Sequence, residues 1–338
     1  MSNNHIPLTA LFILTFLCNT AYAQETRFLF PVACTLGRDC WTVHYVDVDP
    51  AENEAKDFTC AEKTYDSHKG TDFALSSYAQ MKKGVDVLAA AKGTVLRLRD
   101  EKSDRLKTKE ELATIKENGK ECGNGILIDH GDGLQSIYCH LKKDSILVKP
   151  KQRVKAGQKI AQIGQSGWAE FPHLHFGVLL DGIILDPYTG FASNDGCGKM
   201  KERLWHIGQP LKHEPVALFD GGFRPAPPDF DAIKRGEENP QTLSLKSAAF
   251  TFWSGFYNVE QGDQITMEIH DPEGTLFTTQ TMTQKKTRPR QFFFVGRKIG
   301  KVQLKPGTYQ GTTTLTRASK DTKTQEIKRT RTFKVDVK

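Results

Sequence analysis

Four histidines and one aspartate stand in short motifs that lie in three separate parts of the chain. They are His68, Asp72, His140, His173 and His175. His173 and His175 form a His-x-His pair, and residues at this spacing in an extended strand point to the same side, about 6–7 Å apart. If the five side chains act together, the fold must bring three distant segments to one cleft. This requirement constrains the fold more than any other feature of the sequence.

The chemistry of these side chains favours a metal ion. His68 and Asp72 form a His-x-x-x-Asp pair, and Gly70 between them suits a tight turn that enters a strand. Three neutral or anionic ligands of this kind suit zinc and leave a fourth position for water. The two remaining histidines would then be free for proton transfer and charge stabilisation. Spacing alone does not decide whether His173 or His175 binds the metal.

The other histidines are interpreted as surface residues or satisfied core residues, which is the usual state of a single histidine. They are His5, His44, His130, His206, His213 and His270. Tyr65 and Asn124 lie close to the motifs in sequence, and neither is assigned a role.

Further motifs accompany the five residues over about a third of the chain. They occupy residues 68–74, 87–95, 123–131, 138–141, 154–161, 163–167, 172–176 and 186–187. In order and density they resemble the lysostaphin-type (LytM-like) zinc metallopeptidases, which cut peptide bonds in bacterial peptidoglycan. This resemblance implies the β fold of that family, the duplicated hybrid motif, for the peptidase core.

The resemblance also implies a role for each of the five residues. His68, Asp72 and His175 match the zinc ligands of the family, which implies one Zn²⁺ per chain. His140 and His173 match its two catalytic histidines. One would act as the general base, and one or both would stabilise the tetrahedral oxyanion. Because all five residues are present, we expect a secreted zinc-dependent metalloendopeptidase that hydrolyses the peptide cross-links of peptidoglycan.

Two other functions stay open at this point. Family members that have lost these residues activate other hydrolases, so one alternative is a non-catalytic activator or binding protein for another cell-wall hydrolase. The second alternative is a secreted protease that acts on other proteins. Metal content and turnover would test the first, and an assay on cell-wall sacculi against protein substrates would test the second.

A highly charged insert at residues 99–121 separates two of the motifs. Within it, residues 104–116 predict a short exposed helix with Leu106, Leu112 and Ile115 directed inward. The insert could shape the cleft or form a solvated excursion, and the second interpretation is preferred.

The first residues predict export. An apolar run at residues 8–18 is too short to span a bilayer, and the small residues Ala21 and Ala23 suit signal cleavage, so we expect a signal peptide at residues 1–23. No later stretch predicts a transmembrane segment. The expected location is therefore the periplasm or the outside of the cell.

After residue 23 the chain has six cysteines, and an even number in an exported chain favours disulfides. The expected pairs are Cys122–Cys139, Cys34–Cys40 and Cys60–Cys197. A hairpin that turns at residues 131–133 places the first pair on adjacent strands. The second pair is close in sequence, and the third is what remains.

The length of the chain allows two domains. The expected parts are an N-terminal cysteine-containing segment at 24–63, a zinc metallopeptidase domain at 64–195, a linker at 196–240 and an accessory domain at 241–338. Short β-branched runs between glycines predict an all-β, β-rich fold with an antiparallel-sheet peptidase core. Six strand-like runs between residues 243 and 337 predict a C-terminal immunoglobulin-like β-sandwich.

The formal net charge is +7, and the basic excess lies toward the C-terminus. Residues 221–338 contain 20 Lys and Arg against 12 Asp and Glu, a net charge of about +8. Such a surface favours anionic polymers. The expected partners are therefore the peptide stems of peptidoglycan and, through the basic C-terminal domain, anionic envelope polymers. Nucleic acid is not expected, because the exported chain lacks interleaved aromatic and basic motifs.

Overall fold

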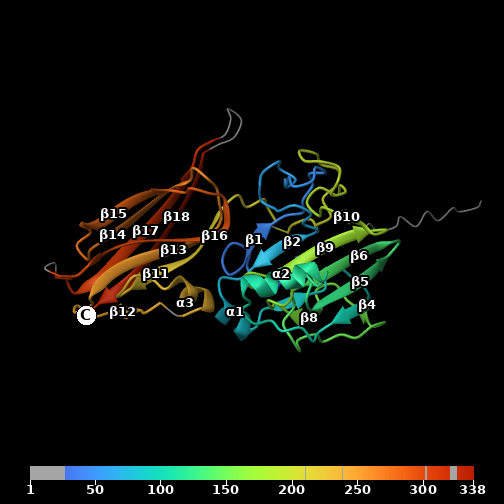
Figure 1. The fold of residues 1–338 in the computed structure, drawn as a ribbon, viewed down its shortest axis with the longest axis horizontal. Helices are drawn as coiled ribbons and strands as arrows, with labels where there is room; N and C mark the ends of the chain where they lie inside the picture. Colours follow the sequence, from blue (N-terminus) through green and yellow to red (C-terminus); the bar gives the residue numbers. More distant parts are fainter. Residues whose placement is uncertain (1–26, 210, 238, 301–302, 320–325) are drawn as a thin grey trace, which may run out of the picture.

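The computed structural model describes residues 27–209, 211–237, 239–300, 303–319 and 326–338. The predicted signal peptide lies outside these residues. Within them strands dominate, so the predicted all-β fold class is confirmed. Two β-rich units lie side by side, an N-terminal unit and a C-terminal β-sandwich (Figure 1). None of the described helices has the length and apolar character needed to span a lipid bilayer.

An eight-stranded antiparallel sheet forms the N-terminal unit. Its main path runs in the spatial order β1 (Trp41–His44), β2 (Thr71–Ala74), β9 (His173–Leu180), β6 (Leu134–Cys139), β5 (Gly125–Gly131), β4 (Gly93–Arg99) and β7 (Arg153–Val154). The eighth strand, β10 (Ile183–Leu185), pairs with β9. A separate ladder joins β3 (Asp86–Leu88) to β8 (Lys159–Gln162). The consequence for the site is that β9 lies between β2 and β6.

The two faces of β9 differ as its alternating sequence predicts. Leu174, Phe176 and Val178 are fully buried in the hydrophobic core of the N-terminal unit. His173 and His175 alternate with them, so the two histidines point to the opposite face of the sheet. The apolar residues of β9 therefore anchor the strand in the core, while both histidines of the His-x-His pair point to the opposite face.

All three predicted disulfides are present. They are Cys34–Cys40, Cys60–Cys197 and Cys122–Cys139. The last pair joins the segment before β5 to the final residue of β6, and the backbone N–H of His140 donates to the carbonyl of Cys122 at 2.8 Å. The Cys122–Cys139 disulfide therefore stabilises the chain immediately before His140.

Three short helices complete the described elements. They are α1 (Tyr78–Lys83), α2 (Lys109–Glu117) and α3 (Phe230–Arg235). Helix α2 lies in the charged insert, where a helix was predicted from residue 104, and it begins later because Thr108 caps it. The Thr108 hydroxyl accepts from the backbone N–H of Glu111, and the Glu111 side chain accepts from the backbone N–H of Thr108.

The C-terminal β-sandwich has two sheets that enclose one hydrophobic core. The smaller sheet orders β11 (Ala217–Arg224), β13 (Ala249–Val259) and β16 (Arg288–Lys298). The larger orders β12 (Thr242–Leu243), β18 (Ile327–Val337), β17 (Gly307–Arg317), β14 (Gln264–His270) and β15 (Leu276–Thr283). Phe250, Phe252 and Phe256 of β13 are fully buried in the core between them.

The sandwich takes in part of the segment that was expected to be a linker. Within residues 196–240, β11 pairs antiparallel with β13, and α3 follows it. Gly221 and Gly222 of β11 let other groups approach the strand closely. A Cβ at Gly221 would lie 2.6 Å from the Phe333 ring, and one at Gly222 would lie 2.3 Å from the side chain of Asn239.

A third buried cluster joins the two units where β1 meets β13. The N-terminal unit contributes Trp41, Val43, Ala74 and Phe171, and the sandwich contributes Ala217, Phe219 and Tyr257. A buried ionic network also joins the two units. Its members are Lys63 with Glu260, and Arg317 with Glu260 and Asp263.

Candidate metal centre

Three neighbouring strands bring the five predicted residues together. β2 pairs with β9, so that Asp72 lies directly opposite His175. β6 pairs with β9 on its other side and ends at the residue before His140. His173 is the first residue of β9, and His68 lies in the turn that enters β2.

Three of these side chains converge on one point. Asp72 Oδ1 lies 3.2 Å from His68 Nε2 and 2.9 Å from His175 Nδ1, and the two nitrogens are 3.1 Å apart. The three atoms are close enough to ligate a single ion. Two imidazole nitrogens and one carboxylate oxygen are a donor set that suits zinc.

Gly70 allows the turn that carries His68 to pack closely on β9. A Cβ at this position would lie 2.6 Å from His175 Nε2 and 2.7 Å from the carbonyl oxygen of Phe176. Any other residue would push the turn away from the strand. The glycine between the two motif residues is therefore part of the geometry of the site.

The outer atoms of the three donors are held by hydrogen bonds. His68 Nδ1 donates to the carbonyl oxygen of Tyr45 at 2.6 Å, which leaves Nε2 as the unprotonated donor. The second carboxylate oxygen of Asp72 lies 3.0 Å from His44 Nδ1. His44 was interpreted from sequence as a surface or core histidine. Its position beside Asp72 becomes visible only in the structure, where β1 pairs with β2 and His44 lies opposite Asp72.

His44→Ala is expected to weaken metal binding without removing any of the three donors. Outer partners orient metal ligands, and their loss typically lowers metal affinity by about 10–100-fold. Competition with a chromophoric chelator measures this affinity. His213→Ala is the matched control, because His213 makes a similar contact with Asp57, at 2.9 Å, away from the three donors. Equal affinities of the His44 and His213 variants would contradict the role of His44.

The carboxyl group of Asp72 stays ionised in this setting. Burial alone would raise its pKa, but the neighbouring His68 and His173 and the hydrogen bonds from His175 and His44 hold the pKa well below the ordinary value. The buried Asp72 carboxylate, surrounded by histidines, therefore favours the binding of a cation.

His140 and His173 lie beside the three donors, with ring centroids 4.5 Å apart. Each donates its Nδ1 proton to a backbone carbonyl, His140 to Ser166 and His173 to Phe171, both at 2.8 Å. Burial lowers the pKa of both imidazoles, and for His140 the neighbouring His173 and His175 lower it further. Both rings are therefore neutral near pH 7 and keep an unprotonated Nε2.

The backbone of His140 is itself constrained. Its φ is 63°, a left-handed conformation that is uncommon for residues other than glycine. Its N–H is bound to Cys122, and its carbonyl accepts from the backbone N–H of Gly164 at 3.0 Å. Strain of this kind persists only where the surroundings determine it, and it clusters at functional sites.

Tyr65 lies next to the donors, and Asn124 does not contact them. The Tyr65 ring centroid is 4.4 Å from that of His68 and 5.6 Å from that of Trp168. Burial and the nearby Asp72 raise the pKa of Tyr65, so its hydroxyl remains a proton donor. Asn124 instead exchanges hydrogen bonds with the backbone of Lys102 and so anchors the insert.

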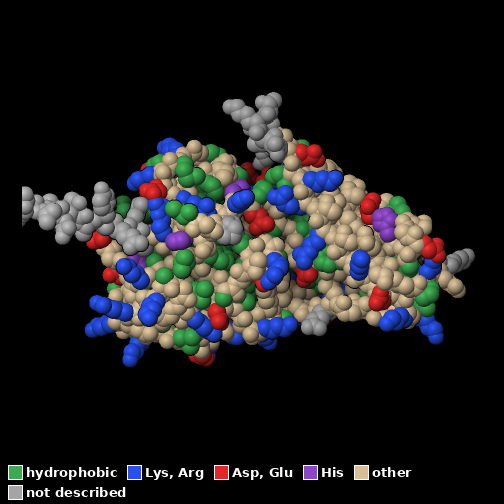
Figure 2. Space-filling model, turned by 180° about the vertical axis from the view of Figure 1, so that it is seen from behind, with side chains coloured by type: hydrophobic (Ala, Val, Ile, Leu, Met, Phe, Trp, Pro, Cys, Tyr) green, Lys and Arg blue, Asp and Glu red, His purple; other side chains and the backbone are tan. Residues whose placement is uncertain are grey.

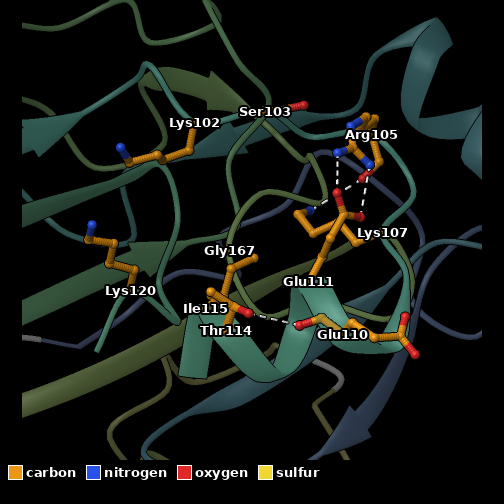
Figure 3. A pocket seen from close by; sticks show the side chains of 10 residues that line it. All are labelled: Lys102, Ser103, Arg105, Lys107, Glu110, Glu111, Thr114, Ile115, Lys120 and Gly167. Atoms are coloured by element: carbon orange, nitrogen blue, oxygen red, sulfur yellow. Dashed lines mark hydrogen bonds and ion pairs between the residues drawn. The ribbon is translucent and has the colours of Figure 1, made fainter. Parts of the chain in front are cut away.

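The insert is tied to Asn124 and lines an open pocket of about 490 Å³, while most of its side chains are exposed, as expected for a solvated excursion. Its lining residues are Lys102, Ser103, Arg105, Lys107, Glu110, Glu111, Thr114, Ile115, Lys120 and Gly167. Figure 3 shows Arg105 and Lys107 gathered near Glu111, with Lys102 and Lys120 directed away from that group. Gly167 follows Ser166, the partner of His140, so the pocket and the metal centre share one segment of chain.

Comparisons with known proteins find a family match for the part of the chain that contains the site. Residues 66–187 match the model of "Peptidase family M23". The peptidoglycan DD-endopeptidase ShyA of Vibrio cholerae is 33% identical over 115 residues, 34% of this chain and 21% of that protein. The murein hydrolase activator NlpD of Escherichia coli is 43% identical over 65 residues, 19% of this chain and 16% of that protein. The chain thus spans only about a sixth to a fifth of the length of these relatives.

Among solved structures, a zinc-containing peptidase from Vibrio cholerae is 28% identical, with a TM-score of 0.31. The match covers 48% of this chain and 39% of that chain. Residues 66–187, which match the model of peptidase family M23, contain all five predicted site residues.

Proposed function

We propose that this chain is an exported zinc-dependent endopeptidase that hydrolyses the peptide cross-links of bacterial peptidoglycan. One observation carries the proposal. Three donors suited to zinc lie within 3.2 Å of one another, beside two histidines that each keep an unprotonated Nε2. The M23 domain and the relative named as a peptidoglycan endopeptidase support this substrate class. The three disulfides fit an oxidising compartment outside the cytoplasm.

The residues of this chain divide the chemistry between them. His68, Asp72 and His175 would hold the zinc, which supplies Lewis-acid polarisation of the scissile carbonyl and lowers the pKa of water. His140 or His173 accepts a proton at Nε2 and returns it to the leaving amine. The protonated ring, together with the Tyr65 hydroxyl, provides hydrogen-bond donors for the developing oxyanion.

Mass spectrometry of fragments released from purified sacculi tests the proposal. We expect soluble peptide-linked fragments without chelator, and none after the metal is removed, with recovery on adding zinc. Failure to release fragments, combined with stimulation of another cell-wall hydrolase, would instead identify an activator. Cleavage of unfolded proteins but not of sacculi would identify a general protease.

The pocket that the insert lines is expected to receive an anionic part of the substrate. In the part of the chain that the structure describes, the Lys120 side chain has no ion-pair partner, whereas Arg105 pairs with Glu111. Lys120→Glu should therefore raise KM about 3–10-fold for substrates with a free carboxylate, the scale of one exposed charge contact. Substrates with that carboxylate amidated should be unaffected.

Lys246→Glu is the matched control, because Lys246 is an exposed lysine of the sandwich. Steady-state kinetics on the paired substrates gives the result. An equal KM change in both lysine variants would show that the effect is one of overall charge. Binding of an anionic envelope polymer by the C-terminal domain stays a prediction. Figure 2 shows Lys and Arg side chains spread over the visible face of the molecule.

A further inference from the structure

The ends of β2 and β9 nearest the metal centre are held by the sandwich. The Tyr257 hydroxyl on β13 donates to the carbonyl oxygen of Leu75 at 2.6 Å. Arg290 on β16 donates from Nη2 to the carbonyl oxygen of Ser76 at 2.7 Å. Leu75 and Ser76 directly follow β2, whose last residue, Ala74, lies opposite His173.

The same two side chains contact the segment that precedes His173. The Phe171 ring centroid lies 5.7 Å from that of Tyr257 and 5.9 Å from the guanidinium carbon of Arg290. The carbonyl of Phe171 accepts the Nδ1 proton of His173. The backbone N–H of Leu75 donates to the carbonyl of Pro172 at 3.0 Å and so connects the two segments.

Arg290 has an environment that fixes its position. Its guanidinium lies over four aromatic rings, Phe171, Phe219, Tyr257 and Phe292, at 5.2–5.9 Å from their centroids. These distances are within the range of cation–π attraction, about 6 Å. The planar guanidinium stacks on rings and donates in a rigid fork, which lysine does not reproduce.

We propose that Arg290 and Tyr257 are positioning residues for His173, so that the sandwich is part of the catalytic apparatus. They bind the backbone carbonyls of residues 75–76, which follow the neighbouring strand β2, and they contact the ring of Phe171, which precedes His173. The carbonyl of Phe171 determines which ring nitrogen of His173 carries the proton and where Nε2 lies. A displacement of about 1 Å in such a group can lower a rate about 100-fold. The kinetic consequence rests on the proposed function, whereas the placement of the ring does not.

Arg290→Ala, Arg290→Lys and Tyr257→Phe test these contacts in the full chain. For Arg290→Ala we expect kcat to fall about 10-fold or more, with KM within about twofold and zinc content unchanged. Arg290→Lys should recover only part of the loss. In protein labelled with ¹⁵N-histidine, the Nδ1–H resonance of His173 should broaden or disappear while that of His140 persists. Tyr257→Phe keeps the ring and removes one hydroxyl, so it tests the contacts if Arg290→Ala does not fold.

Arg297→Ala is the matched control. Arg297 lies on the same strand, β16, with its guanidinium carbon 5.6 Å from the Phe277 ring centroid, and it takes no part in the junction with β1. Normal kcat and an unchanged His173 signal in the Arg290 and Tyr257 variants would overturn the proposal. An equal loss in Arg297→Ala would also overturn it. If the wild type itself shows no turnover, the proposed function fails, and the His173 signal still decides the positioning.

Discussion

Replacing His175 with Ala is expected to abolish both zinc binding and turnover. His175 Nδ1 is one of the three donors, and two donors do not form a complete site. Metal-ion catalysis supplies several kcal/mol of transition-state stabilisation, so the loss in kcat should be about 10³-fold or more. Metal analysis of the purified variant and fragment release from sacculi measure the two effects.

The control for this variant is His270→Ala, which removes a histidine of the sandwich and should leave zinc and activity unchanged. Circular dichroism and thermal unfolding of both variants show whether the fold is kept. One zinc per chain in His175→Ala, with normal turnover, would mean that the donor set has been wrongly assigned.

His140→Ala and His173→Ala should separate catalysis from metal binding. Neither residue belongs to the three donors, so both variants should retain zinc. General acid–base catalysis typically contributes about 10²–10⁴-fold, and loss of one oxyanion donor costs about 10²–10³-fold. We therefore expect a fall in kcat within these ranges, with KM changed little.

A double variant of both histidines sharpens the comparison. If they act as one unit, the double variant should lose little more activity than the more damaged single variant. Single-turnover kinetics at matched zinc content gives these values. Near-normal cleavage by both single variants would exclude a catalytic role for either ring.

The sequence predicts the site where its motifs are local. His68 and Asp72 are joined by one turn, and the alternation of β9 puts His173 and His175 on one face. The fold class follows from short β-branched runs punctuated by glycine. The pairing Cys122–Cys139 follows from a predicted hairpin, Cys34–Cys40 from closeness in sequence, and Cys60–Cys197 is the pair that remains. Each of these inferences depends on neighbours in sequence or on a spacing that a strand imposes.

The remaining features depend on contacts between distant segments. His44 is recognisable only when β1 pairs with β2. Strand β11 lies in the segment expected to be a linker, and its Gly221 and Gly222 take their place only when Phe333 and Asn239 pack against them. The pocket requires the insert to be tied to Asn124. No periodicity in a single segment encodes such packing, since tertiary contacts override local preference.

The buried ionic network has a consequence for how the molecule unfolds. Lys63 comes from the N-terminal unit, whereas Glu260, Asp263 and Arg317 come from the sandwich, and all four residues are at most 7% exposed. Separating the units would leave these charges without partners and expose the aromatic residues of the junction. An unpaired buried charge is strongly destabilising. The two units should therefore melt in one cooperative transition, and neither should persist as an independent thermodynamic domain.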